Sequence, residues 1–275
     1  MKIISDNRTQ INTVVVEIKV TAEDFKEAVQ NVYLRKRESI KIFGFKKGKA
    51  PRKLIELLYG RQIFYEDAIR EIIVKAADEL KLEVVGVPKV EMSGSPGKGG
   101  VNLWVEYTVK PKVKIFNYIG IEVETTDSDA GTEDAMDDML ATRLAEMLEG
   151  EIPEAMYERR VADMLWEWEA RNKGNVTLQD YLKYAGLTEE QFRQSFRESA
   201  EIQVKFRLAL EKIAELEGIN VTQEELEERY REIAEEQKMD IEKVKAGIDA
   251  GQLSNDMAVQ KAFVFVKGYA NLSIK

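Results

Sequence analysis

The eight residues from Gly44 to Pro51, GFKKGKAP, place one phenylalanine and three lysines between residues with special backbone behaviour. Gly44 and Gly48 permit backbone dihedral angles that are closed to other residues, and Pro51 fixes φ where the segment ends. Lysines held on such a turn form a compact positive tip for phosphate groups, at a smaller ordering cost than a flexible tail. The segment therefore predicts an anion-binding turn.

The basic character extends to both sides of this turn. Residues 35–53 hold nine lysines and arginines and one acidic residue, Glu38. A charge run is usually a solvated face, and this simpler interpretation competes with a binding role. The position of the lysines at a turn, rather than along a helix face, favours binding. The sequence leaves open whether Phe45 is exposed or packs into the core.

Missing residue types exclude much of enzyme chemistry. The 275 residues include no cysteine and no histidine. Disulfides, thiol nucleophiles, Cys/His zinc sites and histidine general bases are therefore excluded, and we expect no metal and no cofactor. An enzyme would have to use carboxylates, lysine or tyrosine.

No run approaches the ~18 apolar residues of a membrane span, and no secretory signal is visible, so we expect a cytoplasmic protein without a membrane partner.

Charge is distributed unevenly along a chain that is long enough for about two domains. Residues 1–120 hold 22 lysines and arginines against 15 acidic residues, a balance of +7. Residues 121–275 hold 19 against 35, a balance of −16, which gives the net charge of −9. Such asymmetry indicates that one half meets an anionic surface while the other half has a different task.

Residues 1–112 show the mixed periodicity of an α+β domain. The strand-like runs are Thr13–Val20 and the two that flank the loop Ser93–Gly100. A helix is predicted from an N-cap at Thr21 toward Ile42, a short one between Pro51 and Gly60, and a long one over Gln62–Leu80.

Helical periodicity is lost from residue 113 to 131 and dominates after residue 132. We therefore predict an extended linker over 113–131, whose end is the polar stretch Thr125–Gly131, and an α-helical domain over 132–275. Helices are predicted to begin at Pro153, Thr177, Thr188 and Thr222.

The basic turn and three later stretches resemble one known family. GFKKGKAP with Tyr59–Gly60 after it is similar to the ribosome-docking signature of bacterial trigger factor, usually G-F-R-K-G-x-x-P followed by Tyr-Gly. Three further stretches are similar to the C-terminal domain of that family, in the same order: Glu151–Leu165, Tyr181–Arg193 and Ile219–Glu228.

The resemblance implies a multi-domain α+β protein, in which an N-terminal ribosome-binding domain precedes an all-α chaperone domain with helical arms. It implies docking at the ribosomal tunnel exit, on protein and rRNA, and ATP-independent holding of nascent or unfolded polypeptides. No DNA partner is implied, and members of the family can form homodimers that bury the docking face. The docking positions that match are Gly44, Phe45, Lys46, Lys47, Gly48 and Pro51.

Two departures from the family pattern matter. Lys46 stands where arginine is usual, so the charge is kept but the planar bidentate group is lost. The family normally carries an FKBP-like prolyl isomerase domain between the linker and the C-terminal helices. Residues 120–151 pass from linker to helix with no room for that domain, so we expect no isomerase activity.

Binding of varied polypeptides needs adaptable apolar surface, and seven of the nine methionines lie in residues 121–275. Methionine repacks around different shapes, although a methionine stripe at helical spacing is more often core. The acidic helix predicted over Asp134–Gly150 is the best candidate for exposed apolar contacts. By helical spacing, its candidate residues are Met136, Met139, Leu140 and Met147.

Three alternatives remain at this point. The chain could be a prolyl isomerase, against which the missing middle domain argues. It could be an RNA-binding module that uses only the basic half, although it has no recognisable RNA-binding motif. It could be a periplasmic peptide-binding chaperone, because the C-terminal helices resemble those too, but no signal sequence is visible.

Overall fold

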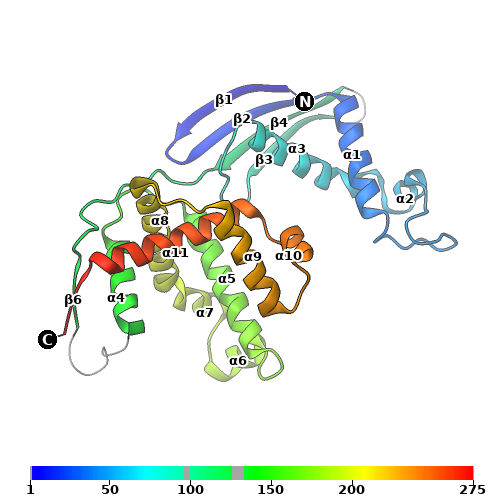
Figure 1. The fold of residues 1–275 in the computed structure, drawn as a ribbon. Helices are drawn as coiled ribbons and strands as arrows, with labels where there is room; N and C mark the ends of the chain where they lie inside the picture. Colours follow the sequence, from blue (N-terminus) through cyan, green and yellow to red (C-terminus); the bar gives the residue numbers. More distant parts are fainter. Residues whose placement is uncertain (1, 96–98, 126–132, 275) are drawn as a thin grey trace. The chain divides into compact units, whose positions relative to one another are not determined.

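A computed structural model describes residues 2–95, 99–125 and 133–274. The chain divides into two compact units, Met1–Pro111 and Lys112–Lys275, which we call unit 1 and unit 2. Figure 1 shows a sheet with helices in the first and an assembly of helices in the second. The chain is thus α+β in its N-terminal part and almost entirely helical beyond it, which confirms the predicted fold class.

A four-stranded antiparallel sheet forms one layer of unit 1, in the order β1-β2-β4-β3. Alternate side chains of β2 and β4 point into the core, as the β-branched alternation predicts. Val16 lies opposite Val105 and Ile18 opposite Leu103, and all four are buried. The strands are β1 (Lys2–Gln10), β2 (Thr13–Val20), β3 (Lys89–Ser95) and β4 (Gly100–Thr108).

Two long helices pack their apolar stripes into the same core as the sheet. The helical elements are α1 (Ala22–Lys36), α2 (Arg52–Tyr59), the 3-10 turn η1 (Arg61–Phe64) and α3 (Tyr65–Glu79). The Thr21 hydroxyl accepts a hydrogen bond from the backbone of Asp24 and caps α1, as predicted. The extension of this helix toward Ile42 is wrong. Beyond Lys36, Ile40 and Ile42 reach the core from a segment that is not helical.

Unit 2 is organised around α8, which packs against α4, α5 and α11. The predicted caps at Thr177, Thr188 and Thr222 are all present, the last two as full capping boxes. Among the described residues, no helix is long and apolar enough to cross a membrane. The helices are α4 (Glu133–Glu146), α5 (Glu154–Asn172), α6 (Leu178–Ala185), α7 (Glu189–Ser195), α8 (Arg197–Glu217), α9 (Gln223–Gln237), α10 (Ile241–Gly247) and α11 (Ala250–Tyr269).

The segment that leads into α4 is extended as far as Thr125, but it is a core element of unit 2 and not a separate connector. Ile115, Ile121 and Val123 are buried with residues of α4, α8 and α11. Strand β5 (Glu122–Thr125) pairs in parallel with β6 (Asn271–Ile274) at the other end of the chain. Extended segments that bury isolated apolar residues have no helical period, which is why the sequence suggested a linker. The remainder of that prediction, 126–132, lies outside the described residues.

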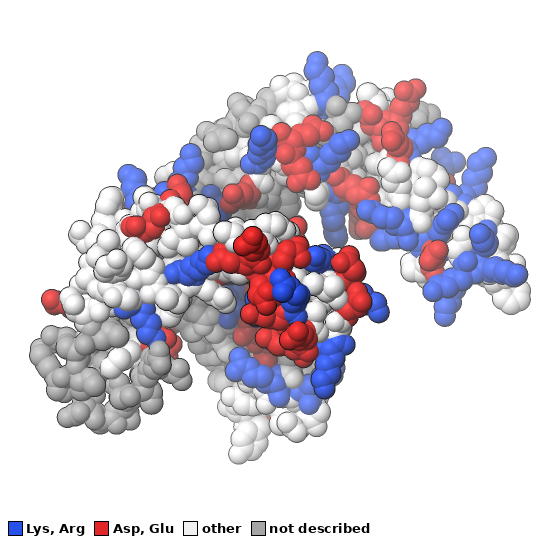
Figure 2. Space-filling view, in the orientation of Figure 1, with Lys and Arg blue, Asp and Glu red and all other residues white. Residues whose placement is uncertain are grey.

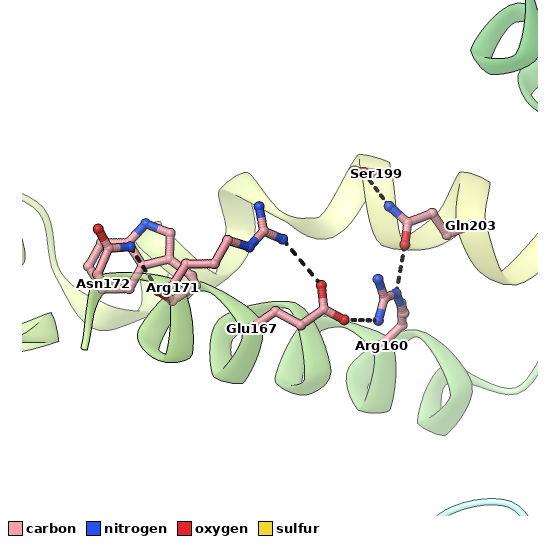
Figure 3. Close-up of polar contacts among 7 residues, drawn as sticks. Arg160, Glu167, Arg171, Asn172, Ser199 and Gln203 are labelled. Carbon is pink, nitrogen blue, oxygen red and sulfur yellow. Dashed lines mark hydrogen bonds and ion pairs between the residues drawn. The ribbon is translucent and has the colours of Figure 1, made fainter. Parts of the chain in front are cut away.

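A polar network joins α5 to α8 beside the aromatic core of this region. Arg160 Nε donates to Gln203 Oε1 at 2.7 Å, and its Nη1 donates to Glu167 Oε1 at 2.8 Å (Figure 3). Arg171 lies 3.5 Å from the other oxygen of Glu167, and Gln203 donates to Ser199 at 3.1 Å. The hydrogen bond from Arg160 is the main cause that lowers the pKa of Glu167 below its usual value. The network therefore holds Glu167 ionised.

A substitution at Gly100 tests how closely the backbone of β4 approaches the end of β2. Its φ is +86°, and a Cβ at this position would lie 2.3 Å from the carbonyl oxygen of Val20. Gly100→Ala is expected to lower the free energy of unfolding of unit 1 by about 2 to 4 kcal/mol, because the clash adds to backbone strain. Denaturation followed by the fluorescence of Trp104 measures the change. Gly99→Ala is the control, because a Cβ there meets nothing within 4 Å. Equal stability of the two variants would contradict the argument.

The Glu167 network predicts a pH dependence. Glu167→Gln should cost no more than about 1 kcal/mol near neutral pH, because the pair is partly exposed and screened. The pKa of Glu167 is lowered in the folded state, so its contribution is present above the unfolded pKa and disappears as the pH falls through the folded one. Urea unfolding of the wild type and the variant at about pH 7 and about pH 3 should show this difference shrink.

Glu169→Gln on the same helix is the matched control for this experiment. Its effect should be close to zero at both pH values, because Glu169 is exposed and makes no hydrogen bond or ion pair with the described residues. A cost of Glu167→Gln that is equally large at about pH 3 would show that packing, and not the carboxylate charge, is responsible.

Candidate functional site

The loop that carries GFKKGKAP begins from a fixed base at the end of α1. The backbone N–H of Arg37 donates to the Tyr33 carbonyl at 2.8 Å, and the Ser39 hydroxyl donates to the Lys36 carbonyl at 2.7 Å. Ile40 and Ile42 then pack against the core of unit 1. The chain is therefore anchored by apolar contacts up to the residue before the tip.

Two successive turns build the tip itself. The backbone N–H of Phe45 donates to the Ile42 carbonyl at 3.2 Å, and that of Lys49 donates to the Lys46 carbonyl at 2.9 Å. Gly44, with φ of +83°, and Gly48, with φ of +74°, each occupy the third position of one turn. A positive φ at that position is the mark of a type II turn and favours glycine. The spacing of the two glycines thus follows from the two turns.

The exit of the loop is held as firmly as its entry. The Tyr33 hydroxyl donates to the carbonyl of buried Ala50 at 3.0 Å. Gly48 is also buried, and a Cβ there would approach Glu38 Cγ to 3.1 Å. Pro51, with φ of −64°, then leads directly into α2. A loop tied at both ends pays little ordering cost when a partner binds.

Between these anchors the side chains of the tip face solvent. Phe45 is 43% exposed, and Lys46 and Lys47 are exposed beside it. The question that the sequence left open is therefore settled in favour of exposure. Phe43, which the sequence analysis did not single out, is 103% exposed. Phe43 lies in a non-helical run between the core residue Ile42 and Gly44, and this position could have identified it as exposed.

The lysines of this loop carry charge that the described residues of the chain do not neutralise. Three basic residues on α1 and α2 are paired: Arg35 with Glu71, Lys36 with Asp67 at 2.5 Å, and Arg52 with Glu56 at 2.5 Å. Within the described parts of the chain, five lysine side chains of the loop and the start of α2 make no ion pair. We call these the lysine patch: Lys41, Lys46, Lys47, Lys49 and Lys53. Figure 2 shows basic side chains gathered over this end of unit 1.

Helix α2 continues the surface. Ile55 is its buried anchor, whereas Leu57, Leu58 and Tyr59 are exposed. Gly60, with φ of +89°, ends the helix after Tyr59. The Tyr-Gly pair that follows the basic turn in sequence is thus the end of the helix that the turn leads into.

The second predicted site, on α4, agrees less well with the structure. Leu140 is 1% exposed and packs with Leu144 in the core of unit 2, so its assignment to a binding surface is wrong. Met147 packs partly against the same core, and Met136 is half-buried. Met139, 38% exposed, is the most open of the four. Helical spacing found one face of α4, but a large part of that face packs against α8.

Exposed aromatic residues elsewhere in unit 2 offer more apolar surface than α4. Trp166 on α5 and Tyr184 on α6 are both largely exposed. On the helices α5, α6 and α7, the rings of Trp168, Tyr181 and Phe192 lie 5.0 to 5.3 Å apart in a shared cluster. The sequence analysis missed Trp166, although its position off the apolar stripe of α5 could have revealed it.

Curated relatives share the name trigger factor. The protein of Caldicellulosiruptor bescii is 42% identical over 117 residues, which cover 41% of this chain and 26% of that protein. That of Alkaliphilus oremlandii is 28% identical over 207 residues, which cover 70% of this chain and 48% of that protein. The matches to these two relatives thus span about a quarter to a half of their length.

The fold is similar to a solved structure described as "Promiscuous Substrate Recognition in Folding and Assembly Activities of the Trigger Factor Chaperone". The TM-score is 0.53 at 15% identity, over 96% of this chain and 99% of that one. Two family models match the sequence directly. "Bacterial trigger factor protein (TF)" covers residues 1–143, and "Bacterial trigger factor protein (TF) C-terminus" covers residues 119–267. From its N-terminal sheet to its last long helix, the chain belongs to the bacterial trigger factor family.

Proposed function

We propose that this chain is an ATP-independent chaperone that docks on the ribosome at the tunnel exit and holds unfolded polypeptides on unit 2. The observation that carries the proposal is the projecting tip of the loop, where Phe45, Lys46 and Lys47 are exposed on a doubly anchored turn. Such a partner would place the chain in the cytoplasm.

Docking combines two kinds of contact. The lysine patch supplies long-range attraction to rRNA phosphates and acidic protein surface, which is strong at low salt and screened at high salt. Phe45 supplies an apolar anchor of the kind that fills a small pocket on a partner protein. Gly44, Gly48 and Pro51 hold these side chains in place and need no contact of their own. Lys46 contributes charge without the bidentate geometry of arginine.

Holding of clients relies on exposed apolar side chains set on stable helices. Trp166 and Tyr184 present large apolar area on α5 and α6, the helices that also carry Trp168 and Tyr181 of the aromatic cluster, and Met139 adds an adaptable side chain on α4. Scattered apolar contacts of this kind bind many sequences weakly, which suits a chaperone that must release its client without ATP.

The proposal includes no prolyl isomerase step. The two family matches overlap over residues 119–143, which supports the expectation that no isomerase domain lies between them. A peptide assay for proline isomerisation should therefore give the uncatalysed rate.

The docking loop is tested by co-sedimentation with ribosomes. Phe45→Ala/Lys46→Ala/Lys47→Ala should raise the dissociation constant about tenfold or more at about 0.15 M salt, because it removes the anchor and two phosphate contacts. The control is Val87→Ala/Lys26→Ala/Lys75→Ala, which makes the same change in charge at exposed positions of unit 1. If the two triple variants co-sediment with ribosomes to the same extent, the docking assignment is wrong.

The holding surface is tested by suppression of aggregation. Trp166→Ser/Tyr184→Ser should lower the protection of a chemically unfolded reporter protein about twofold or more, because it removes two large apolar contacts without touching the core. Light scattering at equal chaperone concentrations measures the effect. The control Val74→Ser/Val87→Ser changes two exposed apolar residues of unit 1. An equal loss in both variants would argue against a specific role for unit 2.

A further inference from the structure

We propose that Phe43 is a second aromatic contact of the docking loop, and that its ring stacks on an unpaired base of RNA. The inference rests on the proposed docking of this loop to the ribosome, and it assigns a specific chemistry to one residue of that contact. It concerns a side chain outside the GFKKGKAP segment.

The conformation of the turn presents Phe43 to solvent. It is the second residue of the turn that the Phe45 N–H closes onto the Ile42 carbonyl. Ile42, directly before it, packs on the core, whereas Phe43 is 103% exposed. A phenylalanine offers about 150 to 250 Å² of apolar surface, and here the described residues of the chain cover almost none of it. The two faces of the ring are therefore available to a partner.

The charge around Phe43 indicates what kind of partner this is. Lys41 precedes it by two residues, Lys46 and Lys47 follow shortly after, and none is neutralised by an ion pair with the described residues. A partner that covers the ring must also supply negative charge next to it. Single-stranded RNA does both, because each nucleotide offers a phosphate and a flat base with two apolar faces.

The two aromatic residues of this turn, Phe43 and Phe45, would then make different kinds of contact. Phe45 is 43% exposed and partly supported by its own unit, as suits an anchor in a preformed pocket. Phe43 is free on all sides, as a ring that inserts beside an unstacked base must be. The same lysines serve both contacts, so the electrostatic and stacking contributions lie side by side in one loop.

Three substitutions separate stacking from burial in an apolar protein pocket. With ribosomes as the partner, Phe43→Ala and Phe43→Leu should each raise the dissociation constant about tenfold, whereas Phe43→Tyr should bind like the wild type. Leucine keeps the apolar volume but has no flat face. The salt dependence should not change, because the lysines are retained. Wild-type binding by Phe43→Leu would overturn the proposal in favour of a protein pocket.

Photo-crosslinking identifies the partner directly. A benzophenone amino acid at position 43 should crosslink to rRNA, whereas the same group at the exposed control position Val87 should not. Crosslinks from position 43 to protein alone would overturn the proposal. Vesicles of anionic phospholipid provide a further test. If Phe43→Ala abolishes binding to these vesicles but leaves ribosome binding unchanged, the proposal is also overturned.

The outcomes distinguish this inference from the proposed function. If the Phe45/Lys46/Lys47 triple variant loses ribosome binding while all Phe43 variants bind like the wild type, docking stands and stacking by Phe43 is overturned. If the triple variant binds as well as the wild type, the docking assignment fails and the inference fails with it. Exposed Phe43 makes no core contact, so all three variants should keep the wild-type unfolding midpoint.

Discussion

A loop proposed to dock on a large partner must keep its shape in the free protein, and in this chain that constraint is met at the base of the loop rather than at its tip. The hydrogen bond from Tyr33 to the Ala50 carbonyl joins α1 to the end of the loop. Ring contact between Tyr33 and Phe64, at 6.0 Å between centroids, ties the same residue to the start of α3. The side chains of Phe43, Lys46 and Lys47 at the tip can then remain exposed.

In unit 2, too, the residues that hold the structure together differ from those that are exposed for binding. Apolar residues of α8 contact α4, α5 and α11, so this one helix carries most of the cohesion of the unit. Polar networks at its surface, such as Arg160 with Glu167 and Gln203, fix how α5 lies along it. Once these contacts hold the helices, individual aromatic residues can remain exposed without loosening the core.

Local signals in the sequence were sufficient for the helix caps and for the turns of the loop. Thr188 and Thr222 cap helices because their hydroxyls pair with nearby backbone N–H groups, and such pairing depends on three residues of sequence alone. Gly44 and Gly48 are equally local, because a turn is defined by four residues. These predictions did not require knowledge of the tertiary structure.

Exposure could not be predicted in the same way. Leu140 and Met139 are neighbours on an amphipathic helix, and which of them faces α8 depends on a partner more than sixty residues away. Ile115, Ile121 and Val123 do not follow a helical period. They lie on an extended segment, and their burial depends on spaces between the helices that they pack against. Ile40 and Ile42 pack against the core, whereas Phe43, directly after them, is exposed.

The burial of Val123 on one side and Leu140 on the other has a consequence for how such a chain can change in evolution. Both flanks of residues 126–132 are fastened to one core, and β6 pairs with β5 just before this point. The core contacts described on either side are made by residues outside this stretch, and the entropic cost of closing a connection grows only as the logarithm of its length. A change in chain length at this junction should therefore cost little stability, because the contacts that hold its two flanks are formed elsewhere.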